Sequence, residues 1–266
     1  LPATFCAGMT LPLITFALVR QGHGEKSIGE VYAANTLGAI AGVVIAVHLG
    51  LPLLGLKGVI NLGAGIDIAL GLLLLWKVTP AEGRVRVSLA GTAALAILLA
   101  SSMFLHFDSH KMASGVYRLG KIIKPEAADI TFHQDGKTAS VDLIEYRRKD
   151  GLTVISTNGK PDAGINMAQG SGHTQDEATM VMAAAIPLAL NPRATRAANI
   201  GLGSGLTSHA LLSSPALTRV DTIEIEQAMV EAAHGFQPRV DRVFNDPRSH
   251  IHIDDAKTFF SSHFER

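Results

Sequence analysis

The chain has 266 residues, of which 47% are hydrophobic, and its mean hydropathy of +0.27 is too apolar for one ordinary soluble domain. Its 23 Lys and Arg balance its 23 Asp and Glu, so we expect no nucleic-acid partner. The single cysteine, Cys6, excludes an internal disulfide. Charged residues are sparse up to Phe107 and reach ordinary density from Asp108 onward. The chain therefore combines two unlike parts, and we expect it to be a piece of a longer protein that lacks both ends.

The apolar part contains stretches long enough for membrane-spanning helices, because about 20 apolar residues are needed to cross a bilayer core. We predict a transmembrane region at 1–108, with about four helices at 1–19, 31–56, 59–76 and 87–107. Membrane lipid would then be a partner of the chain. Basic residues are balanced between the two sides of these spans, so charge alone does not set their orientation.

The first soluble region, 109–163, has the pattern of a small antiparallel β-region. Short alternating runs are separated by three dipeptides that favour the positive φ of tight hairpins, namely Asp135-Gly136, Asp150-Gly151 and Asn158-Gly159. We therefore predict a β-hairpin domain here, followed by a polar, glycine-rich loop at 164–175.

The second soluble region, 164–266, alternates helix and strand patterns. Strands are predicted at 197–201, 219–224 and 250–254, and helices at 176–190, 206–212 and 227–236. This order predicts a Rossmann-like, methyltransferase-type α/β domain with a parallel sheet. A fourth strand is expected to begin at Phe264-Glu265-Arg266, so the sheet would be truncated after its third strand.

A glycine-rich turn follows the first of these strands. Gly201, Gly203 and Gly205 form a G-x-G-x-G pattern that also includes Ser204, and it differs by one residue from the dinucleotide fingerprint. Glycines allow a backbone to approach a ligand closely. We therefore predict that these four residues contact the sulfur substituent or amino-acid-like tail of a bound nucleoside.

Acidic residues lie at the ends of the next two strands. Glu224 ends the second strand, and Asp254 and Asp255 end the third. Ligands bind at the carboxyl edge of a parallel sheet, so we expect Glu224 to accept hydrogen bonds from ribose hydroxyls. We expect Asp254, Asp255 and the backbone of Ala256 to line the adenine. Glu226 is interpreted as a solvated acid at a helix N-terminus.

Longer segments of the chain resemble one family. Residues 28–39, IGEVYAANTLGA, are similar to a segment of bacterial membrane-fused spermidine synthase-like proteins. The soluble part contains further similar elements: Asn158-Gly159-Lys160, Ile186-Pro187-Leu188, Gly201 to Gly205, 223–226, Asp246-Pro247-Arg248 and 253–256. The resemblance covers nearly the whole chain.

The resemblance implies a β-domain followed by a Rossmann-like domain. It implies a transferase of polyamine biosynthesis, with decarboxylated S-adenosylmethionine as co-substrate, an amine such as putrescine as acceptor and methylthioadenosine as product. The family's proton acceptor is a carboxylate after the fourth strand, so the catalytic residue is expected beyond Arg266. Adenosyl compounds are cytosolic, so the soluble domain is expected in the cytoplasm and the helices in the bacterial inner membrane.

The chain departs from true spermidine synthases around the amine. Ser204 stands where their glycine turn carries an aspartate, and the helix at 176–190 lacks the Tyr, His and Glu that line their amine pocket. Two alternatives stay open: a methyltransferase that uses S-adenosylmethionine, and a non-catalytic membrane protein that senses an adenosyl ligand. A homo-oligomer is also left open. His173 is expected in a surface loop, and no cluster has the spacing of a metal site.

Overall fold

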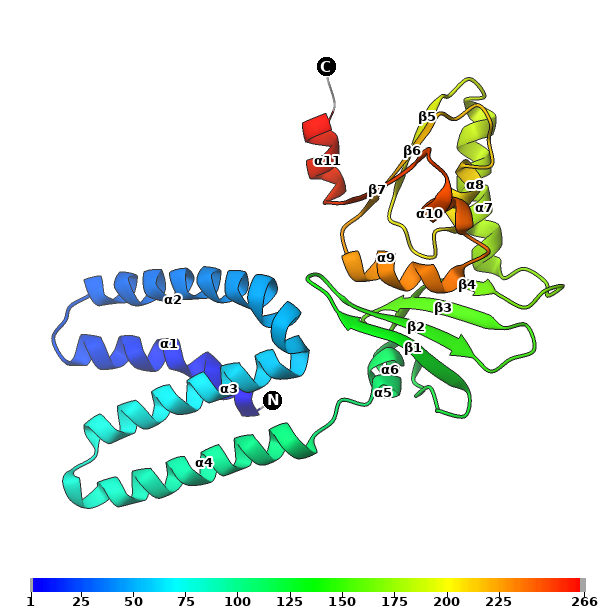
Figure 1. Cartoon of the computed structure of the whole chain (residues 1–266). Coiled ribbons are helices and arrows are strands. Elements are labelled where there is room, and N and C mark those ends of the chain that lie inside the picture. The colour runs from blue at the N-terminus through cyan, green and yellow to red at the C-terminus, as the bar shows by residue number, and fades with distance from the viewer. Residues whose placement is uncertain (1, 264–266) are drawn as a thin grey trace. The chain divides into compact units, whose positions relative to one another are not determined.

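Four long helices form the apolar part of the chain. A computed structural model describes residues 2–263, so the expected start of a fourth strand at 264–266 lies outside the described residues. The helices and helical turns are α1 (Pro2–Arg20), α2 (Lys26–Ile45), the π-helical turn η1 (Ala46–Gly50), α3 (Leu51–Val78), the 3-10 turn η2 (Ala81–Gly83) and α4 (Arg84–Phe104). α1 and α2 pack together as a hairpin in a compact unit that ends at Val59 (Figure 1).

Two helical stretches of the described chain are long and apolar enough to cross a membrane. They are Lys26–Val78, with 53 residues, and Ala81–Phe104, with 24, while a shorter apolar helix covers Thr4–Arg20. The second and third predicted spans both fall within the first stretch, but they are two helices that meet at a kink close to the predicted boundary between 56 and 59. The kink lies at Gly55, where φ is 64° and ψ is 177°, a conformation that glycine adopts without a side-chain clash. Length and composition do not place these helices in a membrane, so their insertion stays a prediction.

An antiparallel sheet follows two short helices, α5 (Ser109–Ala113) and α6 (Val116–Leu119). Its strands pair in chain order, as β1 (Ala128–Asp135), β2 (Ser140–Tyr146), β3 (Leu152–Thr157) and β4 (Lys160–Asn166). The predicted antiparallel region is confirmed, and positive φ values occur at Gly151, Asn158 and Gly159, in the predicted turns. β4 continues to Asn166, so the polar loop begins three residues later than predicted.

The rest of the described chain alternates helices and strands. The elements are α7 (Gln175–Leu190), β5 (Arg196–Ile200), α8 (Leu206–Leu211), β6 (Arg219–Glu224), α9 (Gln227–Ala233), η3 (His234–Phe236), α10 (Asp241–Asn245), β7 (Ser249–Ile253) and α11 (Ala256–His263). The three strands run parallel in the order β5-β6-β7, which confirms the predicted α/β unit. α7 begins with a capping box, in which Thr174 and Glu177 each accept a hydrogen bond from the other's backbone N–H.

One hydrophobic core joins the antiparallel sheet to the parallel unit. It combines side chains of β2, β3 and β4 with those of the turn after β5, α8, α9 and η3, including Val141, Leu143, Ile155, Ile165, Leu202, Leu206, Ala232 and Phe236. Burial of each large side chain stabilises the fold by about 1.5–3 kcal/mol. α9 lies between the two sheets (Figure 1). A Cβ at Gly235, within η3, would lie 2.2 Å from Leu143 Cδ2, so this packing is close. The core therefore holds the antiparallel sheet next to the carboxyl end of β6.

Candidate functional site

The glycine turn after β5 leaves part of its backbone open. Gly201, Gly203 and Gly205 have φ values of 85°, 54° and 86°, which side chains rarely adopt. A Cβ added at Gly201 would meet no described atom within 4 Å, and one at Gly203 would meet only the Ala163 side chain, at 3.9 Å. Gly205 differs, because it is buried against residues that include Val243. The turn can therefore admit a ligand at its first two glycines, while the third serves packing.

Glu224 connects this turn to the end of β6. Its side chain is buried, and its two carboxylate oxygens accept hydrogen bonds from the backbone N–H groups of Leu202, at 2.8 Å, and Glu226, at 2.9 Å. An ionised carboxylate offers about four acceptor positions. Two positions are used by the described residues 2–263, so two remain for hydroxyl donors. The acid is thus fixed by backbone groups, and its binding of a ribose diol stays a prediction.

The end of β7 lies beside Glu224. The backbone N–H of Asp254 donates to the backbone oxygen of Glu224 at 3.0 Å, and Asp254 Oδ1 accepts from the Asp255 N–H. Asp255 is exposed, and its Oδ1 accepts from the N–H and hydroxyl of Thr258 in the first turn of α11, which begins at Ala256. The predicted strand-end acids therefore share one edge of the sheet, and their ligand roles stay predictions.

Ser204 does not present its hydroxyl to this edge. The residue is fully buried, and Ser204 Oγ lies 3.2 Å from the sulfur of Met180 on α7. A ligand contact by Ser204 would have to come from its backbone. The Ser204 side chain packs between the turn and α7, and a ligand contact by this residue stays a prediction.

Glu226 is not the solvated acid that the sequence predicts. Its side chain is buried, although it does cap α9 by accepting from the Ala228 N–H at 3.3 Å. Glu226 Oε2 also accepts from the N–H and the hydroxyl of Thr138, each at 2.8 Å. A hairpin 88 residues away in sequence thus supplies the partners that replace water.

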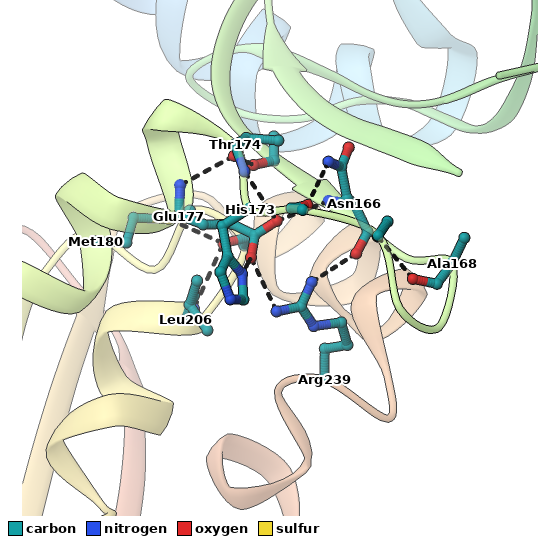
Figure 2. Close-up of polar contacts among 12 residues, drawn as sticks. Asn166, Ala168, His173, Thr174, Glu177, Met180, Leu206 and Arg239 are labelled. Carbon is teal, nitrogen blue, oxygen red and sulfur yellow. Dashed lines mark hydrogen bonds and ion pairs between the residues drawn. The ribbon is translucent and has the colours of Figure 1, made fainter. Parts of the chain in front are cut away.

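A second polar cluster surrounds Glu177 at the start of α7 (Figure 2). The Glu177 side chain is 2% exposed, and one of its oxygens accepts from the Asn166 N–H at 2.8 Å. The other oxygen lies 2.8 Å from both His173 Nδ1 and Arg239 Nη2. Burial would raise the pKa of Glu177, but these hydrogen bonds outweigh it and hold the pKa below its ordinary value. His173 is exposed, as predicted for a loop residue, yet it is paired with a buried acid.

The Glu177 cluster was missed by sequence reasoning. The pattern Thr174-x-x-Glu177 is a capping-box signal and indicates a helix start. It does not indicate that Arg239, 62 residues further on, reaches the same carboxylate.

Comparisons with known proteins find similar sequences in the segment that contains these residues. The model of the spermine/spermidine synthase domain matches residues 177–264, which contain every predicted binding residue. A polyamine aminopropyltransferase of Alkaliphilus oremlandii is 31% identical over 74 residues, 28% of this chain and 26% of that protein. One of Mycobacterium tuberculosis is 25% identical over 265 residues, 95% of this chain and 46% of that protein. Residues 177–264 of this chain are therefore similar to the spermine/spermidine synthase domain.

Other matches extend the comparison. Putrescine N-methyltransferase 1 of Nicotiana tabacum is 31% identical over 74 residues, which cover 28% of this chain and 20% of that protein. The crystal structure of spermidine synthase from Thermotoga maritima matches with a TM-score of 0.43 and 20% identity, over 50% of this chain and 43% of that one. The chain spans less than half the length of each of these proteins.

The Asp246-Pro247-Arg248 segment has a structural role. The Arg248 guanidinium donates to the backbone oxygens of Leu212, Ser214 and Leu217, which follow α8. It also pairs with Asp246 at 2.6 Å, and this pairing lowers the pKa of Asp246. Arg248 therefore satisfies the carbonyls at the end of α8, away from the glycine turn at the helix start.

Proposed function

We propose that this chain binds decarboxylated S-adenosylmethionine and takes part in transferring its aminopropyl group to an amine such as putrescine. The observation that carries the proposal is the buried Glu224 carboxylate next to the open backbone of Gly201. Both residues lie in the segment that matches the spermine/spermidine synthase domain. The polyamine aminopropyltransferases among the relatives support the same reaction class.

The residues present fit an adenosyl group. Two acceptor positions of Glu224 are available for ribose hydroxyls, and a carboxylate that is already fixed loses little freedom on binding. The backbone at Gly201 and Gly203 has room for the sulfonium end of the ligand. Asp255 and the backbone of Ala256 are proposed to contact the adenine.

The proposed reaction forms one bond and breaks one bond. The amine nitrogen bonds to the methylene carbon beside the sulfonium, the carbon–sulfur bond breaks, and its electron pair stays on the sulfur of methylthioadenosine. The new ammonium group then loses a proton. A sulfonium is already a good leaving group, so the protein has to position the amine in line and accept that proton. We propose that the proton acceptor lies beyond Arg266.

We also propose that the helices of residues 2–104 anchor the protein in the bacterial inner membrane, with the soluble region in the cytoplasm. The two long apolar stretches support insertion, and the cytosolic origin of adenosyl ligands supports this orientation. Protease digestion of sealed inverted and right-side-out vesicles tests the orientation. Cleavage of the soluble region only in right-side-out vesicles would contradict it.

A second candidate is methyl transfer from S-adenosylmethionine. The match to putrescine N-methyltransferases favours it. The middle of α7 carries Met180, Val181 and Met182 and no acid, which argues against a dicationic acceptor with either donor. A dicationic amine needs carboxylates to offset the loss of its hydration. The glycine turn and Glu224 would serve either adenosyl donor.

Product analysis separates the candidates. The full-length protein in detergent is incubated with putrescine and either donor, and the products are identified by mass spectrometry. Spermidine and methylthioadenosine formed from decarboxylated S-adenosylmethionine support aminopropyl transfer. N-methylputrescine formed from S-adenosylmethionine supports the second candidate instead. Binding of methylthioadenosine without turnover of either donor would leave the sensing alternative and contradict both enzymes.

A further inference from the structure

The β1–β2 hairpin makes a direct contact with the loop that carries the ribose acid. Thr138, in this hairpin, donates its N–H and its hydroxyl to Glu226 Oε2, both at 2.8 Å. Gly136 lies so close that a Cβ there would be 2.2 Å from Glu226 Oε1. Thr138 itself is exposed, whereas Glu226 is 5% exposed. An exposed side chain of the antiparallel sheet therefore holds a buried acid of the parallel unit.

The backbone of Glu226 connects the Thr138 contact to the Glu224 carboxylate. Only Ile225 separates the two acids, and the Glu226 N–H donates to Glu224 Oε1 at 2.9 Å. The Glu226 side chain also accepts from the Ala228 N–H, which fixes it at the start of α9. The Glu224 carboxylate is held directly by the N–H groups of Leu202 and Glu226, and Thr138 acts on it indirectly, by holding the Glu226 side chain.

We propose that Thr138 and Glu226 are positioning residues for Glu224, so that the nucleoside affinity of the site depends on the β1–β2 hairpin. The inference rests on the proposed function, in which Glu224 binds the ribose. Neither Thr138 nor Glu226 is required to touch the ligand. Their contribution is to keep the two open acceptor positions of Glu224 in a fixed direction, which lowers the ordering cost of binding.

The test measures methylthioadenosine binding to the full-length protein by calorimetry. Thr138→Val removes one hydroxyl from the surface and leaves the hydrogen bond from the Thr138 backbone N–H in place. We therefore expect the affinity for methylthioadenosine to fall roughly three- to tenfold, where a factor of ten corresponds to about 1.4 kcal/mol. Thr138→Ser keeps the hydroxyl and should restore binding to within about twofold of the wild type. Thr131→Val is the matched control, because Thr131 is an exposed β1 residue whose hydroxyl reaches only the Leu143 oxygen, at 3.5 Å.

A second variant tests the same contact by steric displacement. Gly136→Ala places a methyl group against the Glu226 carboxylate and should weaken binding more than Thr138→Val does. Gly172→Ala is its control, because no described atom lies within 4 Å of an added Cβ there. Amide hydrogen exchange gives an independent readout, and the Glu226 N–H should exchange faster in Thr138→Val than in the Thr131→Val control.

The outcomes separate the inference from the proposed function. If the wild type binds and both Thr138→Val and Gly136→Ala bind equally well, the positioning role is wrong and the proposed function stands. The same conclusion follows if affinity falls only in step with thermal stability and Thr138→Ser does not restore it. If the wild type does not bind methylthioadenosine, the proposed function fails, and the inference fails with it.

Discussion

The backbone N–H of Leu202 donates a 2.8 Å hydrogen bond to Oε2 of Glu224, 22 residues further along the chain. This bond ties the glycine turn after β5 to the end of β6, the two elements at which the ribose and the sulfonium end of the ligand are proposed to lie. Glu224 therefore has a structural task in addition to its proposed binding task, and the two tasks can be measured separately.

Removing the Glu224 carboxylate should destabilise the soluble region. Glu224→Ala leaves the buried N–H groups of Leu202 and Glu226 without acceptors, and each unsatisfied group costs about 1–3 kcal/mol. Glu224→Gln retains one good acceptor and should cost less. Urea denaturation of the full-length protein, followed by a soluble-region probe, measures the difference. Equal stability of Glu224→Ala and the wild type would contradict the geometry.

The ion pair between Arg239 and Glu177 should matter more than a surface pair. Arg239→Met leaves the 2%-exposed Glu177 carboxylate without its cationic partner, and we expect a loss of about 1–3 kcal/mol in the free energy of unfolding. Arg147→Met breaks the exposed pair with Asp129 and should lower the free energy of unfolding less than Arg239→Met does. Denaturation curves of the two variants test this order, and a reversed order would refute it.

Asp221 should give the protein an acid-sensitive component of stability. Burial would raise its pKa, but hydrogen bonds from Arg219 and His252 lower the pKa to about 2. The folded pKa lies below the unfolded value of about 3.9, so this stability, roughly 2 kcal/mol, is present above pH 4 and is lost as the pH falls towards 2. Asp221→Asn should flatten the stability profile in that window. Glu145→Gln, at an exposed position, is the control, and an unchanged profile in Asp221→Asn would contradict the assignment.

Arg248 should contribute to stability through its backbone contacts. Arg248→Ala releases the carbonyl oxygens of Leu212, Ser214 and Leu217, and we expect a loss of about 2 kcal/mol or more. Arg248→Lys should recover only part of this loss, because an ammonium lacks the planar fork of a guanidinium. Thermal unfolding of both variants checks the prediction. Full recovery by lysine would mean that charge alone accounts for the effect.

Much of the architecture could be predicted from local patterns. The dipeptides Asp150-Gly151 and Asn158-Gly159 mark real turns because the positive φ of a tight hairpin is a local requirement. Gly201 and Glu224 were placed correctly at the ends of adjacent strands because the βαβ order fixes that edge.

The predictions that were wrong or missing concern residues whose hydrogen-bond partners are distant in sequence. Glu226 looks solvated until the hairpin around Thr138 is packed against it. Glu177 looks like a simple helix cap until Arg239 closes on it. No local pattern contains these contacts, since each depends on the assembled core.

The proposed binding of ribose by Glu224 is tested most directly by calorimetry with methylthioadenosine, on the full-length protein and its Glu224→Gln variant. The control is Glu231→Gln, which alters an exposed acid on α9. The proposed ribose role predicts binding by the wild type and the control, and at least tenfold weaker binding by Glu224→Gln, about 1.4 kcal/mol or more for hydrogen bonds lost to a charged acceptor. Equal affinity of all three proteins, or no binding by the wild type, would contradict it.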